Sequence, residues 1–178
     1  SDPEYLRETK RWYHLARLRV EWDMWKFMED GQHSFKLLTV CPGLTVGPLI
    51  VPQITFGLSI IISYLQGEER EIHDKTVFVV DVRDVAEAHI RLMEDQSASG
   101  RYLCQANRTT WKDILQSLKD LLRDPRIPET VAQGEGKPYQ FTASSKKIEG
   151  LGLTFNVEER ALFDTIDSLK EHNIYKTQ

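Results

Sequence analysis

The feature that most constrains the fold is a long helical pattern from about Arg7 to Asp30, which Gly31 ends. The pattern is apolar on more than one side. A helix of this kind buries its apolar residues only if other elements pack against several of its sides. The sequence therefore predicts packing partners on several sides of this helix, and its two apolar rows are Leu15, Leu18, Trp22 and Trp25, and Trp12, Ala16, Val20 and Met24.

Strand-like and helix-like patterns alternate after this helix, and this alternation predicts an α/β or α+β layer architecture. Turn and capping residues separate the segments, with Asp81 and Asp84 at one helix start and Thr110 with Asp113 at another. The expected strands are 36–40, 77–80 and 101–104, the expected loop is 42–52, and further helices are expected over 56–66, from about 82, from 110 to 124 and from about 156.

Composition limits the class of protein. The 178 residues are 40% hydrophobic and 28% charged with a net charge of −4, which fits one ordinary globular domain or part of one. The apolar stretch Ile54–Leu65 is too short to cross a bilayer, and the acidic balance gives no reason to expect nucleic acid or a membrane as partner. We expect Cys41 and Cys104 to be reduced and, with the polar start Ser1–Glu4, a cytoplasmic location.

Tyr13 and Arg17 are the residues that point to chemistry. Four residues apart on a helix, they share a face, with Cβ atoms about 5–6 Å apart. A fixed cation favours the phenolate and lowers the pKa of a tyrosine, which can then exchange a proton with a carbonyl or alcohol oxygen. Such pairs also occur by chance on surface helices. The five histidines are scattered without cysteine or carboxylate support, so no metal site is predicted.

A series of segments along the chain resembles the extended short-chain dehydrogenase/reductases, in the branch of the cinnamoyl-CoA and dihydroflavonol reductases. A Tyr-x-x-x-Lys-like helix is followed by a strand ending in Pro-x-x-x-x-Gly-Pro. The segments fall in family order and are Trp12-Tyr13 with Glu21, Cys41–Pro48 (CPGLTVGP), Val79–His89 (VVDVRDVAEAH), Ala98–Leu103 (ASGRYL), Lys137–Phe141 (KPYQF), Ser144–Gly152 (SSKKIEGLG) and Asp164–Lys170 (DTIDSLK).

The resemblance implies roles for particular residues. Tyr13 corresponds to the catalytic acid, and Arg17 stands where the family has a lysine that binds the nicotinamide ribose and lowers the pKa of the tyrosine. Pro42, Gly43, Leu44 and Thr45 match the loop whose backbone lies along the nicotinamide end of the cofactor. That cofactor is usually NADP in this branch, with NAD as the other possibility.

The sequence departs from the family in two ways. Arginine keeps the charge of lysine but has a larger, planar head group and cannot give up its proton, so an impaired enzyme and an inactive one are both credible. No Gly-x-x-Gly-x-x-Gly or Gly-x-Gly-x-x-Gly turn occurs, so the pyrophosphate of the cofactor has no recognisable site. In the family, that turn precedes the tyrosine helix.

The resemblance therefore predicts the C-terminal portion of a Rossmann-type doubly wound fold, with an incomplete parallel sheet and a smaller substrate-binding portion. We expect one incomplete reductase domain over 1–178, in which roughly 1–55 and 77–95 lie on the Rossmann side and 56–76 and 96–178 mostly on the substrate side. The strand at 36–40 should keep an unpaired edge and the long helix an uncovered face. We expect a homo-oligomer or pairing with a missing N-terminal half.

Three functions remain open at this stage. The first is the C-terminal half of an NADP-dependent reductase of aldehydes, ketones or acyl-CoA thioesters, small carbonyl substrates to which Tyr13 donates a proton. The second is an inactive homologue that acts as a binding or dimerisation partner, which the apolar helix and Arg17 favour. The third is a sugar-nucleotide epimerase or dehydratase of the same family, which the matches at Lys137–Phe141 and in the C-terminal segment disfavour.

Overall fold

The computed structural model describes residues 2–133 and 143–176, arranged in two compact units. The first unit contains Ser1–Thr39 with Ser97–Gly100, and the second contains Val40–Gln96 with Arg101–Gln178. The α/β class predicted from the sequence is confirmed. The expected family segment Lys137–Phe141 lies outside the described residues.

The first unit is built from two helices, α1 (Pro3–Glu8) and α2 (Trp12–Glu29). The single helix expected from Arg7 to Asp30 is therefore wrong at its start. The chain breaks at Lys10, whose positive φ of 53° a continuous right-handed helix does not allow. The Asp2 carboxylate caps α1 by accepting from the backbone N–H of Glu4, 2.9 Å away. The break folds α1 back onto α2, and Leu6, Leu15 and Leu18 form the small core between them.

Helix α2 leaves much of its apolar surface exposed. Two sides of the helix carry exposed large side chains, and an apolar groove of about 410 Å³ runs along its C-terminal part. The groove continues onto the segment after the helix through Phe35 and Leu37. The exposed apolar residues of the helix are Trp12, Val20, Trp22, Met24 and Phe27.

The strands form two small sheets. β1 (Leu38–Pro42) pairs with β4 (Gly100–Cys104), and β2 (Leu44–Val46), β3 (Thr76–Asp81) and β5 (Asn107–Thr110) form a second sheet in the order β2-β3-β5. β2 runs parallel to β3, with Leu44 opposite Val79, whereas β5 runs antiparallel to β3, with Thr110 opposite Thr76. The parallel part of the predicted sheet is confirmed, and the antiparallel strand was not expected.

Three of the sequence-based expectations for strands need correction. The first strand lies at Leu38–Pro42 rather than at 36–40, so it begins two residues later and continues through Cys41 and Pro42. β2 lies inside the expected loop 42–52, and its three residues are too few to give a strand pattern. β5 has the sequence Asn-Arg-Thr-Thr, which carries no apolar alternation, and only its pairing with β3 makes it a strand.

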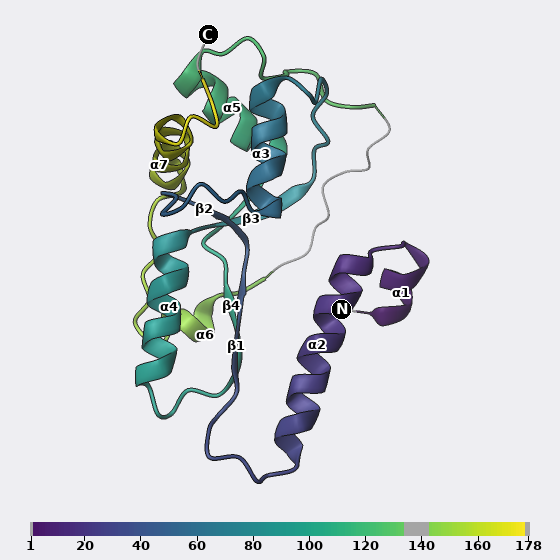
Figure 1. The fold of residues 1–178 in the computed structure, drawn as a ribbon, viewed down its shortest axis with the longest axis vertical. Coiled ribbons are helices and arrows are strands. Elements are labelled where there is room, and N and C mark those ends of the chain that lie inside the picture. The colour runs from purple at the N-terminus through teal and green to yellow at the C-terminus, as the bar shows by residue number, and fades with distance from the viewer. Residues whose placement is uncertain (1, 134–142, 177–178) are drawn as a thin grey trace. The chain divides into compact units, whose positions relative to one another are not determined.

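The helices of the second unit are α3 (Phe56–Gln66), α4 (Val82–Glu94), α5 (Trp111–Leu122), α6 (Lys146–Glu149) and α7 (Glu158–Glu171). Figure 1 shows α3, α5 and α7 gathered around β2 and β3, and α4 and α6 beside β1 and β4. Their starts follow the sequence, because Asp81 caps α4 and Thr110 caps α5 by accepting from the N–H of Asp113.

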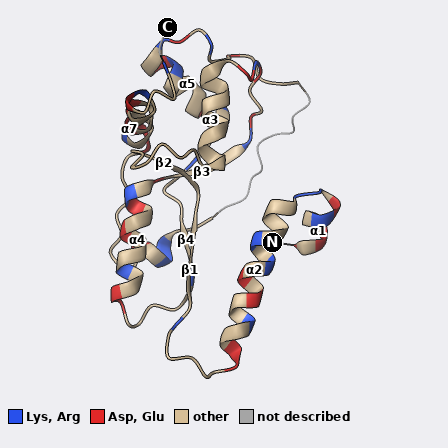
Figure 2. Ribbon diagram, in the orientation of Figure 1, with Lys and Arg blue, Asp and Glu red and all other residues tan. Residues whose placement is uncertain are grey.

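The main core lies between β2, β3 and the helices α3, α5 and α7. Helix α3 carries no charged residue, as its uniform tan colour in Figure 2 shows, and five of its eleven residues are buried. None of the helices in the described part of the chain combines the length and apolar character that a membrane span requires. The most deeply buried large side chains of this core are Ile61, Leu65, Val79, Ile114, Leu115, Leu118, Ile127, Ile166 and Leu169.

An ion pair with a buried carboxylate ties the C-terminal end of the described chain to the loop after α5. The Asp124 carboxylate accepts from the guanidinium of Arg126 and, at 2.5 Å, from the hydroxyl of Tyr175. The Arg126 contacts, with the hydroxyl of Tyr175, hold the pKa of Asp124 well below its usual range. Burial and the same hydrogen bond raise the pKa of Tyr175 to about 12. The ionised carboxylate and the neutral phenol are therefore the forms that the fold stabilises.

We expect Asp124→Asn to lower the free energy of unfolding by about 1–3 kcal/mol at neutral pH, because a buried charged hydrogen-bond partner is lost. A carboxylate with a depressed folded pKa contributes stability above its unfolded pKa of about 3.9 and loses it as the pH falls toward the folded value. The difference between the two proteins should therefore be constant between about pH 5 and pH 9 and shrink below about pH 4. Urea unfolding across this range measures it.

Asp120→Asn on the exposed face of α5 is the matched control and should change stability by less than about 0.5 kcal/mol. A difference between wild type and Asp124→Asn that grows as the pH falls would contradict the assignment of the ionised form to the fold.

Candidate active site

Helix α2 presents the predicted catalytic pair. Tyr13 lies in its first turn with 63% of its surface exposed, and Arg17 lies one turn further along and is also exposed. The ring of Tyr13 contacts the ring of His14 edge to face, with 5.6 Å between the centroids. Because 12–29 is a continuous helix, the i, i+4 spacing puts Tyr13 and Arg17 on one face, as expected. Both residues are thus exposed on the same face of α2.

A second residue of the tyrosine segment has a structural role. The carboxylate of Glu21 accepts from the indole N–H of Trp25 and from the hydroxyl of Thr39, each at 3.3 Å. Thr39 belongs to the start of β1, so Glu21 connects the middle of α2 to the strand that follows it. The sequence marked Glu21 only as part of the resemblance, without this partner.

The predicted cofactor loop, Pro42–Thr45, is the junction between β1 and β2. The Gly43 N–H donates to the carbonyl oxygen of Cys104 at 3.2 Å, and the Thr45 hydroxyl donates to the carbonyl of Gly43 at 3.3 Å. Leu44 packs against the main core, and Pro42 is exposed. Both ends of the loop are thus anchored by strand pairing, and its backbone bends between two sheets.

Gly43 is required by a close approach rather than by its dihedral angles. A Cβ atom at this position would lie 2.2 Å from the carbonyl oxygen of Phe78 in β3, far inside any real contact. The loop therefore lies directly against β3, and only glycine permits it. The predicted cofactor loop is thus also tightly packed against β3.

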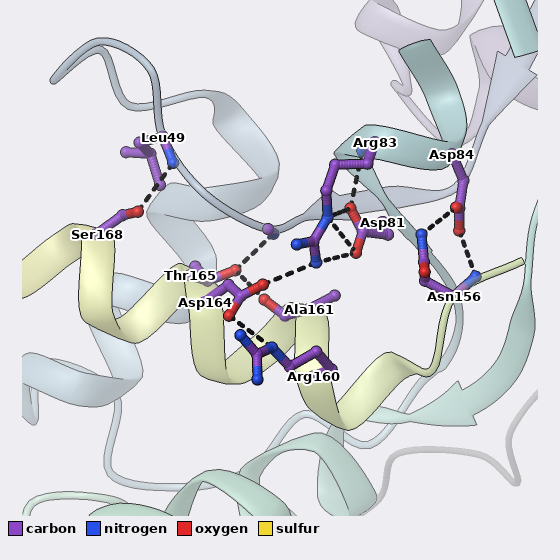
Figure 3. A network of polar contacts seen from close by, with 11 residues as sticks. Leu49, Asp81, Arg83, Asp84, Asn156, Arg160, Ala161, Asp164, Thr165 and Ser168 are labelled. Carbon is purple, nitrogen blue, oxygen red and sulfur yellow. Dashed lines mark hydrogen bonds and ion pairs between the residues drawn. The ribbon is translucent and has the colours of Figure 1, made fainter. Parts of the chain in front are cut away.

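A chain of alternating charges lies beyond the end of β3, drawn in Figure 3. The buried Asp81 carboxylate accepts from the backbone N–H and from the guanidinium of Arg83, with the shortest contact at 2.5 Å, and Arg83 reaches Asp164 of α7 at 2.8 Å. Hydrogen bonding to Asp81 raises the pKa of Arg83 above its ordinary value. Asp164 also pairs with Arg160, its neighbour one turn before. The start of α4 is thereby joined to α7.

Asp84, expected as a helix-start residue, is buried in the first turn of α4. Its carboxylate accepts from the backbone N–H of Asn156 at 2.9 Å and from the Asn156 side-chain amide. Burial raises the pKa of Asp84, and the bonds from Asn156 oppose that rise. Asp84 thus fixes the segment before α7, as Figure 3 shows. Its partner lies 72 residues away and has no signature in the sequence.

The predicted site residues fall into two groups. Tyr13 and Arg17 belong to the first unit, and Pro42, Gly43, Leu44 and Thr45 belong to the second. Within each unit the expected residues do lie together. Among residues 2–133 and 143–176, no group of three or more His, Cys, Asp or Glu side chains is placed to hold a metal ion.

Comparison with known proteins gives clear relatives, although no family model matches the chain. It is 33% identical over 174 residues to cinnamoyl-CoA reductase 1 of Petunia hybrida, which covers 96% of this chain and 51% of that protein. Vestitone reductase from alfalfa superposes with a TM-score of 0.74 at 25% identity, covering 97% of this chain and 57% of that one. The NADPH complex of Gre2 from Candida albicans gives 0.67 at 26% identity, covering 85% and 49%.

The chain therefore belongs to the extended short-chain dehydrogenase/reductases, in the branch of the cinnamoyl-CoA reductases. It spans about half the length of the relatives it matches and corresponds to their C-terminal half. The family includes NADPH-binding reductases. The family and the Rossmann-type fold expected from the sequence are both confirmed.

We expect Gly43→Ala to destabilise the second unit by about 1–3 kcal/mol, because the new methyl group must push the loop away from β3. Gly150→Ala is the matched control, because Gly150 has a helical φ of −60° and a Cβ there meets its nearest atom at 3.3 Å. The control should change stability by less than about 1 kcal/mol. Equal thermal unfolding midpoints for the two variants would show that the loop is not packed as described.

Proposed function

We propose that this chain supplies the C-terminal half of an NADPH-dependent reductase of small carbonyl compounds, namely aldehydes, ketones or acyl-CoA thioesters. The observation that carries the proposal is the exposed Tyr13–Arg17 pair on α2, in a chain that aligns over 96% of its length with a cinnamoyl-CoA reductase. The relatives' names come from whole proteins, so substrate and activity are proposed for this chain by homology.

In the proposed reaction, Tyr13 donates its phenolic proton to the carbonyl oxygen of the substrate. NADPH, when bound, would supply the hydride for the carbonyl carbon of an aldehyde or ketone, which would become an alcohol. Proton and hydride together balance the reduction, and Tyr13 regains its proton from solvent. The exposed position of Tyr13 on the helix fits this role, because the hydroxyl must reach a substrate rather than a buried partner.

Arg17 takes the place of the family lysine in this proposal. Its guanidinium, one turn from Tyr13, stabilises the phenolate that forms when the proton leaves, and its N–H groups are suited to a ribose hydroxyl. It cannot pass a proton on, because the guanidinium stays charged. Arg17 therefore supports the charge and position of the tyrosine but closes any proton relay through a neutral amine.

Pro42–Thr45 provide the wall for the nicotinamide end of the cofactor. The backbone of this loop is held by Cys104 on one side and by pairing with β3 on the other, so it is suited to contact a flat ring without rearranging. The cofactor is NADP, with NAD as the alternative. A glycine-rich turn for the pyrophosphate would have to come from the part of the family fold that this sequence does not contain.

Replacing the proposed acid should remove catalysis without unfolding the chain. We expect Tyr13→Phe to lower the rate of NADPH-dependent reduction of an aldehyde by about 10²–10⁴-fold, the usual contribution of general acid catalysis. Tyr5→Phe, another exposed tyrosine of the same unit, is the control and should leave the rate unchanged. We expect Arg17→Lys to raise the rate if proton relay through an amine matters. The loss of NADPH absorbance measures the reduction rate of each variant.

A wild-type chain that binds no NADPH at millimolar concentration would count against autonomous catalysis. In that case the rate comparison has to be made after supplying the missing half of the fold. Tyr13→Phe and Tyr5→Phe proteins of equal activity in an active assembly would remove Tyr13 from the mechanism.

A second candidate function is a non-catalytic partner that binds other reductase chains through α2. The exposed apolar residues of this helix and the arginine at position 17 favour it. Apolar patches of this kind on a soluble protein commonly mark interaction sites. A chain can both bind other reductase chains and take part in catalysis, but only the binding function would operate without NADPH.

This candidate predicts that the isolated chain associates through the groove on α2. We expect Met24→Glu, inside the groove, to convert the associated form to monomer, because a charge cannot be buried there without a partner. Met93→Glu, at a more exposed methionine on α4 that lies outside the groove, should not. Sedimentation equilibrium over a range of concentrations distinguishes them. A stable wild-type monomer with well-dispersed amide spectra at low concentration would contradict the prediction.

A further inference from the structure

The C-terminal motif Asp164–Lys170 has no role in the proposed chemistry, yet it makes the most specific contacts in the second unit. Thr165 is buried to 1% exposure and Ser168 is also buried, on a helix whose inner face is otherwise apolar. A buried hydroxyl in an apolar surrounding is costly unless it is hydrogen-bonded. The partners of these two hydroxyls identify what the motif does.

Both hydroxyls bind the segment that follows the proposed cofactor loop. The backbone N–H of Gly47 donates to Thr165 Oγ1 at 2.6 Å, and the N–H of Leu49 donates to Ser168 Oγ at 3.1 Å. The residue between them, Pro48, has no N–H. The two backbone donors of this segment are therefore both satisfied by α7, over a separation of more than a hundred residues in the sequence.

Residues spaced along α7, and one just past its end, contact this segment. Thr165, Ser168 and His172 follow an i, i+3, i+7 spacing, which places them on one face. The His172 ring nitrogen lies 3.3 Å from the carbonyl oxygen of Leu49, a third contact to the same segment. The Thr165 hydroxyl donates its own proton to the Ala161 carbonyl at 2.8 Å, which leaves its oxygen free to accept from Gly47. Figure 3 shows Thr165 and Ser168 pointing toward the segment.

Gly47 itself is confined on the other side. Its φ of +127° is a conformation that side chains rarely adopt, and a Cβ there would lie 2.8 Å from Val82 and 3.2 Å from the Asp81 carboxylate. The Asp81–Arg83–Asp164 ion chain holds the start of α4 against α7. Gly47 is thus enclosed between the start of α4 and α7. This packing does not extend to Ile50, which is 95% exposed.

We propose that Thr165 and Ser168 are positioning residues that anchor the Gly47–Leu49 segment and thereby hold the Pro42–Thr45 loop in its cofactor-binding conformation. The functional part of this inference rests on the proposed function. The anchor acts through β2, which joins the loop to Gly47 without any intervening flexible residue and pairs with β3 along its whole length. A C-terminal helix from the substrate side would in this way set the geometry of the cofactor side.

Amide hydrogen exchange of the full chain, followed by NMR, tests the anchor directly. We expect Thr165→Val to accelerate exchange at Gly47 by about tenfold or more, and Ser168→Ala to do the same at Leu49, because each removes the acceptor of one buried bond. The β3 amides should not change. Thr165→Ser keeps the oxygen and should return Gly47 to within about threefold of wild type. Ser63→Ala, whose hydroxyl bonds only within α3, is the matched control.

A second measurement addresses the functional part. We expect Thr165→Val to weaken NADPH binding by about tenfold and Thr165→Ser to restore it, whereas Ser63→Ala leaves it unchanged. If wild type binds no NADPH, the proposed function fails for this chain alone, and the exchange data still decide the anchor. The proposed anchor would be wrong if Thr165→Val left the exchange rate at Gly47 unchanged. It would also be wrong if both Thr165 variants accelerated exchange equally at all amides.

Discussion

The parallel pairing of β2 with β3 is the contact on which the second unit depends. It brings Gly43 within the reach of the Phe78 carbonyl, where no side chain fits, and it places Gly47 beside Asp81 at the end of β3. The apolar helix α3 and the apolar faces of α5 and α7 then cover these two strands. Because the pairing involves only three residues of β2, the surrounding contacts from α7 and the core have to maintain it.

The proposed chemistry is divided between two compact units. The proposed proton donor Tyr13 and the cation Arg17 lie on α2, and the loop proposed to contact the nicotinamide lies at the junction of β1 and β2. Each unit stabilises its own part, through the α1–α2 core in one and through the β2–β3 core in the other. Arginine at position 17 keeps the positive charge of the family lysine but cannot give up a proton.

Elements with strong local signals could be predicted from the sequence. Helices α3, α4 and α5 combine apolar residues with capping residues such as Thr110 and Asp81, α7 has an apolar stripe, and the structure confirms all four. The errors lie where local signals are weak or misleading. Lys10 breaks a pattern that stays helical on both sides, β2 is too short to show a period, and β5 is a strand only because β3 pairs with it.

The sequence by itself determined the α/β class, the family and the placement of Tyr13 and Arg17 on one helical face, because helical periodicity and ordered motifs are local properties of the chain. Only the tertiary structure decided why those motifs include Gly43, Asp84, Asp164 and Thr165. Their partners are Phe78, Asn156, Arg83 and Gly47, mostly far away in the sequence. Contacts between distant residues leave no periodic trace in a single sequence, so their physical reason appears only once the chain is folded.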